Sequence, residues 1–93
     1  MIKSFKCKET EKIFYRIFSR KFSKNIQQIA QRKLLMINAA TTINDLRIPP
    51  SNHLKLLKGN KKEKYSIRMN DQWRICFKWN NNDAYDLEIV DYH

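Results

Sequence analysis

The last three residues of the chain, Asp91-Tyr92-His93, bring together side chains that can take part in proton transfer. The imidazole of His93 exchanges a proton near neutral pH, which makes it the natural candidate for a general acid or base. Tyr92 can transfer a proton through its hydroxyl or stack its ring on a nucleobase. The alternative interpretation is a frayed polar tail, because chain ends are often poorly ordered.

The charge balance indicates what such groups would act on. The 93 residues hold 19 Lys and Arg against nine Asp and Glu, a net charge of +10 with a pI near 9.9. A field of this sign attracts polyanions, and each phosphate contact makes binding more sensitive to salt. We therefore favour a nucleic acid partner over the two alternatives, mere solubility or a basic membrane-surface protein.

Length and composition predict one globular domain over residues 1–93, with 42% hydrophobic residues and few Gly and Pro. No apolar run is long enough to span a bilayer, and the N-terminus lacks the apolar stretch of a signal peptide. Cys7 and Cys76 are far apart and have no zinc-ligand spacing. We expect a cytoplasmic protein with no membrane partner, no bound metal and no cofactor.

Apolar spacing predicts a short first strand over Ile2–Phe5 and two helices after it. The first helix is expected over residues 10–20, and the second runs from an N-cap at Ser23 to about Ala40. The short connection favours an antiparallel helical hairpin. On the second helix, four polar residues are expected to face water: Gln27, Gln31, Arg32 and Lys33.

After a possible helical turn over Thr41–Arg47 and the break at Pro49-Pro50, the pattern changes to strands. Four strands are expected, over residues 54–58, 65–70, 73–79 and 85–90, with Asn- and Asp-rich turns joining the last three into an antiparallel meander. The predicted order is β-α-α-β-β-β-β. This is an α+β fold whose helices cover one face of a mainly antiparallel sheet.

Alternation along these strands separates the two faces of the sheet. The core face is expected to carry Tyr65, Ile67, Met69, Trp73, Ile75, Phe77, Trp79, Tyr85, Leu87 and Ile89. The other face would carry Arg68, Arg74 and Lys78 together with Ser66, Asn70, Cys76, Asp86, Glu88 and Val90, and with Tyr92 if the last strand continues. The sequence thus predicts an open, positively charged platform.

The segment from Lys58 to Lys64 would extend this surface through further phosphate contacts, although a solvated hairpin tip is the simpler interpretation. The stretch from Lys3 to Lys24 is also basic. It is either a second contact for polyanions or the solvent-exposed side of the first helix. No Gly-rich phosphate loop or paired carboxylates with metal-ligand spacing occur. Cleavage of RNA needs neither, because its 2′-hydroxyl is a built-in nucleophile and the enzyme adds a base, an acid and cations.

Several segments resemble the HigB toxins, in the HigB/GraT branch of the RelE/ParE superfamily. They are the opening Met1–Lys6, the pair Lys58-Gly59, the run YSIRMNDQWRICF over Tyr65–Phe77, Asp83-Ala84-Tyr85 and the ending Asp91-Tyr92-His93. The similarity spans nearly the whole chain. It implies a small RelE-like fold and the toxin of a type II toxin–antitoxin system.

The resemblance further implies a metal-independent endoribonuclease that cleaves mRNA in the ribosomal A site. Its implied catalytic set is Lys58, Arg74, Asp91, Tyr92 and His93. RNA or ribosome contacts are expected from Lys55, Lys61, Lys62, Lys64, Arg68 and Lys78. The implied partners are the 70S ribosome with its mRNA and a HigA-type helix-turn-helix antitoxin. Contact with operator DNA would be indirect, through this antitoxin.

One departure from the family pattern affects the catalytic set. Some relatives carry a His two residues before the Leu-Lys-Gly that matches residues 57–59, whereas this chain has Lys55 there and His53 two positions earlier. A lysine does not titrate like imidazole unless its pKa is strongly lowered. We therefore expect His93 to carry most of the acid–base chemistry.

Two other functions remain open at the level of sequence. A ParE-like toxin would inhibit DNA gyrase without catalysis on the same scaffold, and a plain RNA- or ribosome-binding module would need only the basic charge. The terminal Asp91-Tyr92-His93 together with Arg74 favours the nuclease, because neither alternative needs these groups.

Overall fold

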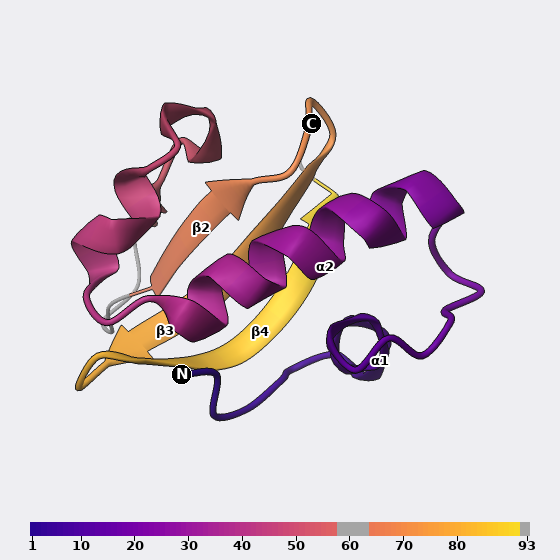
Figure 1. Ribbon diagram of the computed structural model, residues 1–93, viewed down its shortest axis with the longest axis horizontal. Coiled ribbons are helices and arrows are strands. Elements are labelled where there is room, and N and C mark those ends of the chain that lie inside the picture. Colours follow the sequence, from indigo (N-terminus) through magenta and orange to yellow (C-terminus); the bar gives the residue numbers. More distant parts are fainter. Residues whose placement is uncertain (58–63, 92–93) are drawn as a thin grey trace.

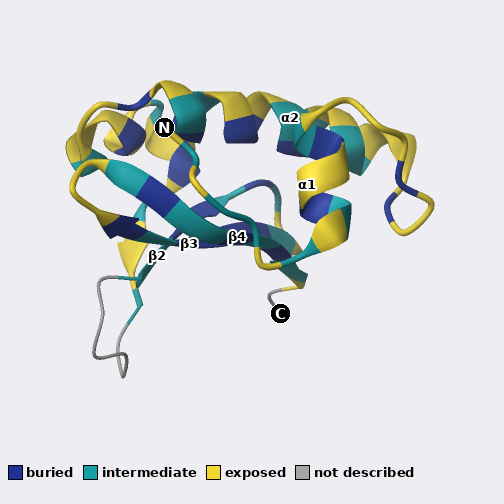
Figure 2. Ribbon diagram, turned by 90° about the horizontal axis from the view of Figure 1, so that it is seen from below, coloured by how far each residue is buried: buried dark blue, intermediate teal, exposed yellow. Residues whose placement is uncertain are grey.

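The computed structural model describes residues 1–57 and 64–91 (Figure 1). It has two layers, with the helices above the sheet when seen from the side (Figure 2). The four strands pair antiparallel in the order β1-β2-β3-β4. The α+β class and the meander are confirmed. The elements are α1 (Lys8–Phe14), α2 (Lys24–Ala39), the 3₁₀ helices η1 (Ile43–Arg47) and η2 (Pro50–Asn52), β1 (Lys55–Leu56), β2 (Lys64–Arg68), β3 (Trp73–Asn80) and β4 (Asp83–Asp91).

Helix α2 begins as predicted, with the Ser23 hydroxyl accepting a hydrogen bond from the Ile26 amide. Helix α1 is shorter than predicted, because it ends at Phe14 where a helix to residue 20 was expected. Arg16 takes a left-handed conformation (φ 62°), and the amides of Arg16 and Ile17 donate back to the carbonyls of Ile13 and Lys12. This Schellman pairing closes the helix. In Figure 1 α1 is seen end-on while α2 runs across the view, so the helices cross and the antiparallel hairpin was wrong.

The N-terminal segment pairs with the sheet without forming a strand ladder. Ile2 and Phe5 make isolated parallel bridges to Ala84 and Leu87 of β4. Four backbone hydrogen bonds of 2.8–3.3 Å join the two segments. The predicted first strand is therefore an edge contact of β4.

The hydrophobic core lies between α2 and the sheet. Ala30, Leu34 and Ile37 of α2 are fully buried against the inward-facing side chains of the strands. The core face predicted by alternation is confirmed as buried at Ile67, Met69, Ile75, Phe77, Trp79, Leu87 and Ile89. Within the residues described, no helix has the length and apolar character to cross a membrane.

Tyr85 departs from the predicted alternation. A register shift between β3 and β4 falls at Cys76–Lys78, opposite Asp86, whose φ of 55° is left-handed. Such a bulge inserts one residue and reverses the alternation beyond it. Tyr85 consequently stands opposite Lys78, on the face away from the helices, and Ala84 takes the buried position opposite Trp79. The placement of Tyr85 in the core was wrong.

Candidate active site on the outer face of the sheet

The face of the sheet that points away from the helices is called the outer face here. Residues opposite each other in an antiparallel pair share a face, so the register defines its members. Between β2 and β3 the pairs are Lys64 with Lys78, Ser66 with Cys76, and Arg68 with Arg74; β4 adds Tyr85 and Glu88, and β1 adds Lys55 opposite Ser66. The basic site residues predicted in strands therefore lie together on the outer face: Lys55, Lys64, Arg68, Arg74 and Lys78.

Arg74 is not part of an open platform, because its residue is only 6% exposed. Its Nε donates to Ser66 Oγ at 2.9 Å, and its Nη2 donates to the carbonyl oxygens of His53 at 2.7 Å and Ser66 at 3.3 Å. These three bonds fix the plane of the guanidinium within the outer face. The prediction gave the correct face for Arg74 but was wrong about its exposure.

The carbonyl that holds Arg74 belongs to a turn that is itself anchored from the helical layer. His53 follows η2 in a left-handed conformation (φ 43°), and the preceding Asn52 is fully buried. The Asn52 amide donates to the carbonyls of Leu46 and Ile48, and its oxygen accepts from Lys33 Nζ at 2.5 Å. Lys33, Asn52, the His53 carbonyl, Ser66 and Arg74 are together called the Arg74 network.

Lys33 was expected in water, but it is 6% exposed. Burial lowers its pKa, and the positive charges of Arg32 and Arg68 lower it further. A signal for this position existed in the sequence, because Lys33 lies three residues after Ala30 and four before Ile37, on the apolar side of the helix. The expectation that Lys33 faces water rested on its charge and not on its spacing.

The remaining cations of the outer face are more accessible than Arg74. Arg68 is ion-paired with Asp71, and Lys78 Nζ lies 3.3 Å from Asp86 Oδ2. Lys55 is exposed and Lys64 is half-buried. Two like-charged pairs stand directly opposite each other, Lys64 with Lys78 and Arg68 with Arg74, an arrangement that costs stability unless an anion lies between them. The outer face is therefore suited to contacts with phosphates.

Asp91 lies at the end of β4, opposite Trp73, with its Oδ2 accepting from Gln72 Nε2 at 3.3 Å. Alternation puts it on the opposite side of the strand from Val90, which shares the face of Arg74. The structure therefore does not bring Asp91 and Arg74 onto one face. Five predicted site residues lie outside the described residues: Lys58, Lys61, Lys62, Tyr92 and His93.

His53 is exposed, and it contributes to the site through its backbone carbonyl, which accepts from Arg74. Cys76, on the outer face between Ser66 and Glu88, is buried. Burial raises the pKa of its thiol, so it stays protonated at neutral pH and is a poor nucleophile. Among residues 1–57 and 64–91, no three His, Cys, Asp or Glu side chains gather as metal ligands would.

Several contributors to this site were not predicted from the sequence. Tyr85 offers an aromatic ring beside Lys78 on the outer face, where a nucleobase could stack. Ser66 was placed on this face but not recognised as a partner of Arg74, and Asn52 was not singled out at all. Only the bulge and the turn geometry reveal these roles.

Comparison with known proteins identifies the family that this fold and site belong to. The family described as the RelE-like toxin of the type II toxin–antitoxin system HigB matches residues 3–93. The chain belongs to the HigB-like toxin family. An Endoribonuclease HigB from Proteus vulgaris is 37% identical over 94 aligned residues, which cover 100% of both chains. The resemblance inferred from the sequence motifs is thereby confirmed.

Two further relatives match over shorter stretches. Toxin HigB-1 of Vibrio cholerae is 46% identical over 55 residues, 59% of this chain and 58% of the relative. An uncharacterized protein of Haemophilus influenzae is 46% identical over 69 residues, 74% of this HigB-family chain and 68% of its own. Membership in a type II toxin family also implies an antitoxin partner.

Proposed function

We propose that this HigB-family toxin is an endoribonuclease that cleaves mRNA in the A site of translating ribosomes and so stops protein synthesis in the cytoplasm. One observation carries the proposal: an arginine held rigidly by three hydrogen bonds on a basic sheet face. A preorganised cation of this kind is what a developing phosphorane charge requires. The name of the Proteus vulgaris relative supports the same activity.

The proposed reaction uses the substrate's own nucleophile. A base removes the proton of the 2′-hydroxyl, and the 2′-oxygen forms a bond to the adjacent phosphorus. The bond from phosphorus to the 5′-oxygen breaks, and an acid supplies the proton that this leaving oxygen takes up. The products are a 2′,3′-cyclic phosphate and a 5′-hydroxyl, and no metal is part of the proposed step.

The roles of the proposed catalytic residues follow from their chemistry. Arg74 and Lys58 stabilise the charge on the phosphorane, and His93 serves as acid or base. Tyr92 orients or stacks the nucleotide, and Asp91 sets the position and protonation of the residues next to it. Tyr85, beside Lys78, adds a second ring for stacking.

Binding to the ribosome and mRNA uses the outer cations. We assign phosphate contacts to Lys55, Lys61, Lys62, Lys64, Arg68 and Lys78. Because such contacts release counterions, toxin association with ribosomes weakens steeply as salt is raised. The antitoxin that restrains the toxin is proposed to be of the HigA helix-turn-helix type, through which the toxin reaches operator DNA.

The test is expression in bacteria followed by mapping of RNA 5′ ends. Cuts in step with codons on translated messages are expected, and His93→Ala should remove them while His53→Ala leaves most of them. Equal loss in both variants would contradict the assignment of acid–base chemistry to His93. Blocked replication with intact messages would instead indicate a gyrase inhibitor. If neither effect is seen, the protein is a module that only binds RNA or the ribosome.

A further inference from the structure

The segment between α1 and α2, residues 15–22, exposes large apolar side chains. Tyr15 is 61% exposed, Ile17 55% and Phe18 67%. Of these, Ile17 and Phe18 line one hollow of the surface, and apolar side chains gathered on a protein surface often mark a binding site. The exposure of Ile17 and Phe18 therefore calls for an explanation.

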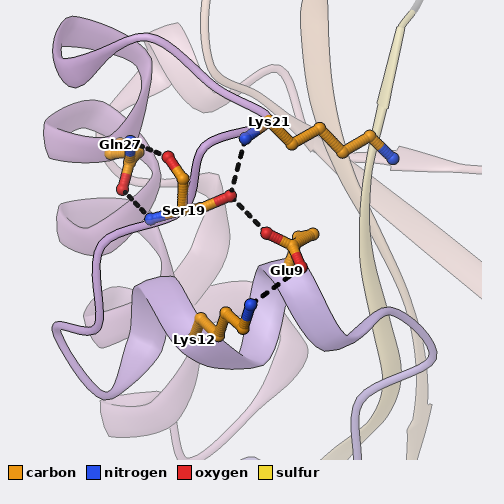
Figure 3. Close-up of polar contacts among 5 residues, drawn as sticks. All are labelled: Glu9, Lys12, Ser19, Lys21 and Gln27. Carbon is orange, nitrogen blue, oxygen red and sulfur yellow. Dashed lines mark hydrogen bonds and ion pairs between the residues drawn. The ribbon is translucent and has the colours of Figure 1, made fainter.

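The segment is held in this conformation by polar contacts around a buried serine (Figure 3). Ser19 is fully buried; its hydroxyl donates to Glu9 Oε1 at 2.5 Å and accepts from the Lys21 amide at 3.2 Å. Gln27 of α2 clamps the backbone of Ser19 on both sides, accepting from its amide at 2.9 Å and donating to its carbonyl at 2.8 Å. Glu9, Ser19, Lys21 and Gln27 are together called the Ser19 network. It fixes the segment with its apolar side chains facing outward.

Beside this segment the surface is hollowed. A groove of about 270 Å³ lies between it and α2, with Ile13, Ile17 and Phe18 as its apolar wall. Arg16 and Lys24 supply its charged rim, and glutamines of α2 complete it. No carboxylate is among the lining residues. The groove therefore suits an apolar segment that carries negative charge.

Two further observations define the occupant. The groove lies beside α2 in the helical layer, whereas Arg74 lies on the outer face of the sheet. Figure 2 shows these two layers from the side. The wall of the groove contains two aliphatic side chains beside the ring of Phe18, and amide side chains of α2 can pair with the polar groups of a peptide. RNA would favour aromatic platforms with denser cations. An acidic amphipathic peptide segment fits this chemistry better.

We propose that the groove formed by Ile13, Ile17, Phe18, Arg16, Lys24 and α2 is the docking site for an apolar–acidic segment of the antitoxin. The proposal rests on family membership, which implies the partner, and does not depend on the nuclease activity. Apolar anchors in the groove supply affinity, and the rim cations select for carboxylates. Arg16 keeps its side chain on this rim although its left-handed backbone would favour glycine.

The test measures binding of the full-length toxin to the antitoxin encoded beside it by titration calorimetry. Ile17→Ser and Phe18→Ser should each weaken binding by roughly tenfold or more, as expected for anchors of an interface. The matched control is Ile48→Ser, because Ile48 is also an exposed isoleucine (76%) but does not line the groove. Equal loss in Ile48→Ser, or no loss in the groove variants, overturns the proposal.

Charge reversal at Arg16 provides a second variant, because this side chain contributes little to the stability of the fold. Arg16→Glu should weaken binding by at least a few-fold, and more at low salt than at high salt, whereas Arg47→Glu on η1 should not. All groove variants should still arrest growth, and co-expressed antitoxin should no longer rescue it. If they bind the antitoxin normally but lose growth arrest or ribosome association, the groove is a ribosome contact and the proposal is wrong. Thermal melting confirms that each variant is folded.

Discussion

The Arg74 network and the Ser19 network use the same device for opposite purposes. Each is built around a fully buried serine, Ser66 on β2 and Ser19 before α2, whose hydroxyl holds a charged side chain. The first network holds a cation within the outer face of the sheet. The second holds a loop so that its apolar side chains point outward.

The difference between the networks teaches how one small chain can separate two tasks. Buried hydrogen bonds are costly to leave unmade, so each network fixes the surface above it. The two surfaces lie on different layers of the fold, the sheet and the helices (Figure 2). Damage to one network should therefore affect one task and leave the other intact.

The largest expected effect is on RNA cleavage. Arg74→Lys keeps the charge but loses the planar fork that bonds Ser66 and the His53 carbonyl, so cleavage should fall by about 100-fold or more. Arg68→Lys is the matched control, because Arg68 faces Arg74 across the strands yet is half-exposed and ion-paired with Asp71. It should lose no more than a few-fold. The measurement is primer extension on translated mRNA, and similar losses in both variants would contradict the role of Arg74.

A matched pair of serine substitutions tests the separation directly. Ser66→Ala should reduce cleavage by roughly tenfold and leave antitoxin affinity unchanged, because it removes the acceptor of Arg74 Nε. Ser19→Ala should do the reverse, weakening antitoxin binding while cleavage persists. Each change should also cost about 1–3 kcal/mol of unfolding free energy, measured with urea. Parallel losses of both activities in either variant would show that the networks are not independent.

At alkaline pH the wild-type protein should become more stable relative to a variant that lacks Lys33 of the Arg74 network. The pKa of Lys33 is lowered from its ordinary 10.5, so the unfolded chain binds this proton more tightly than the folded one. Stability therefore rises with pH between the lowered value and 10.5. The difference in unfolding free energy between the wild type and Lys33→Met should shift in favour of the wild type as pH rises from 7 to 10.5. A difference that does not change over this range would argue against a buried charged amine.

At acid pH the Ser19 network should weaken slightly. The hydrogen bond from Ser19, together with Lys12, lowers the pKa of the Glu9 carboxyl below its ordinary 4.5. Its contribution is full above pH 4.5 and is lost as pH falls through the lowered value. The advantage of the wild type over Glu9→Gln should accordingly disappear on acidification, as followed by thermal melting. An advantage that persists down to pH 2 would contradict this origin.

Some elements could be predicted because local chemistry determines them. Ser23 caps α2, whose apolar spacing matches its buried face, and strict alternation defines the core face of β2 and β3. The early end of α1 could not be predicted, because Arg16 occupies a left-handed position where glycine is usual. The bulge at Asp86 likewise has no marker in the sequence, and with it the place of Tyr85 was missed.

For the candidate site, alternation predicted the face of Arg74 but not what covers it. The covering turn after η2 is far from β3 in sequence, and its anchor Asn52 bonds to groups on α2 and η1 that only the tertiary fold brings near. The same holds for Ser19, whose partners lie on two helices. Long-range polar contacts of this kind leave no periodic pattern to detect.

The N-terminal pairing with β4 has a consequence for how partners can join the molecule. Four backbone hydrogen bonds from residues 1–6 occupy donors and acceptors along this edge of the sheet, and β1 at the other edge is two residues long. Over residues 1–57 and 64–91, the N-terminal segment occupies the β4 edge at Ala84 and Leu87, and the short β1 offers little backbone for strand addition at the other edge. We therefore expect partners to recognise this toxin mainly through its side chains. Its specificity is then open to change by single substitutions, without remodelling of the sheet.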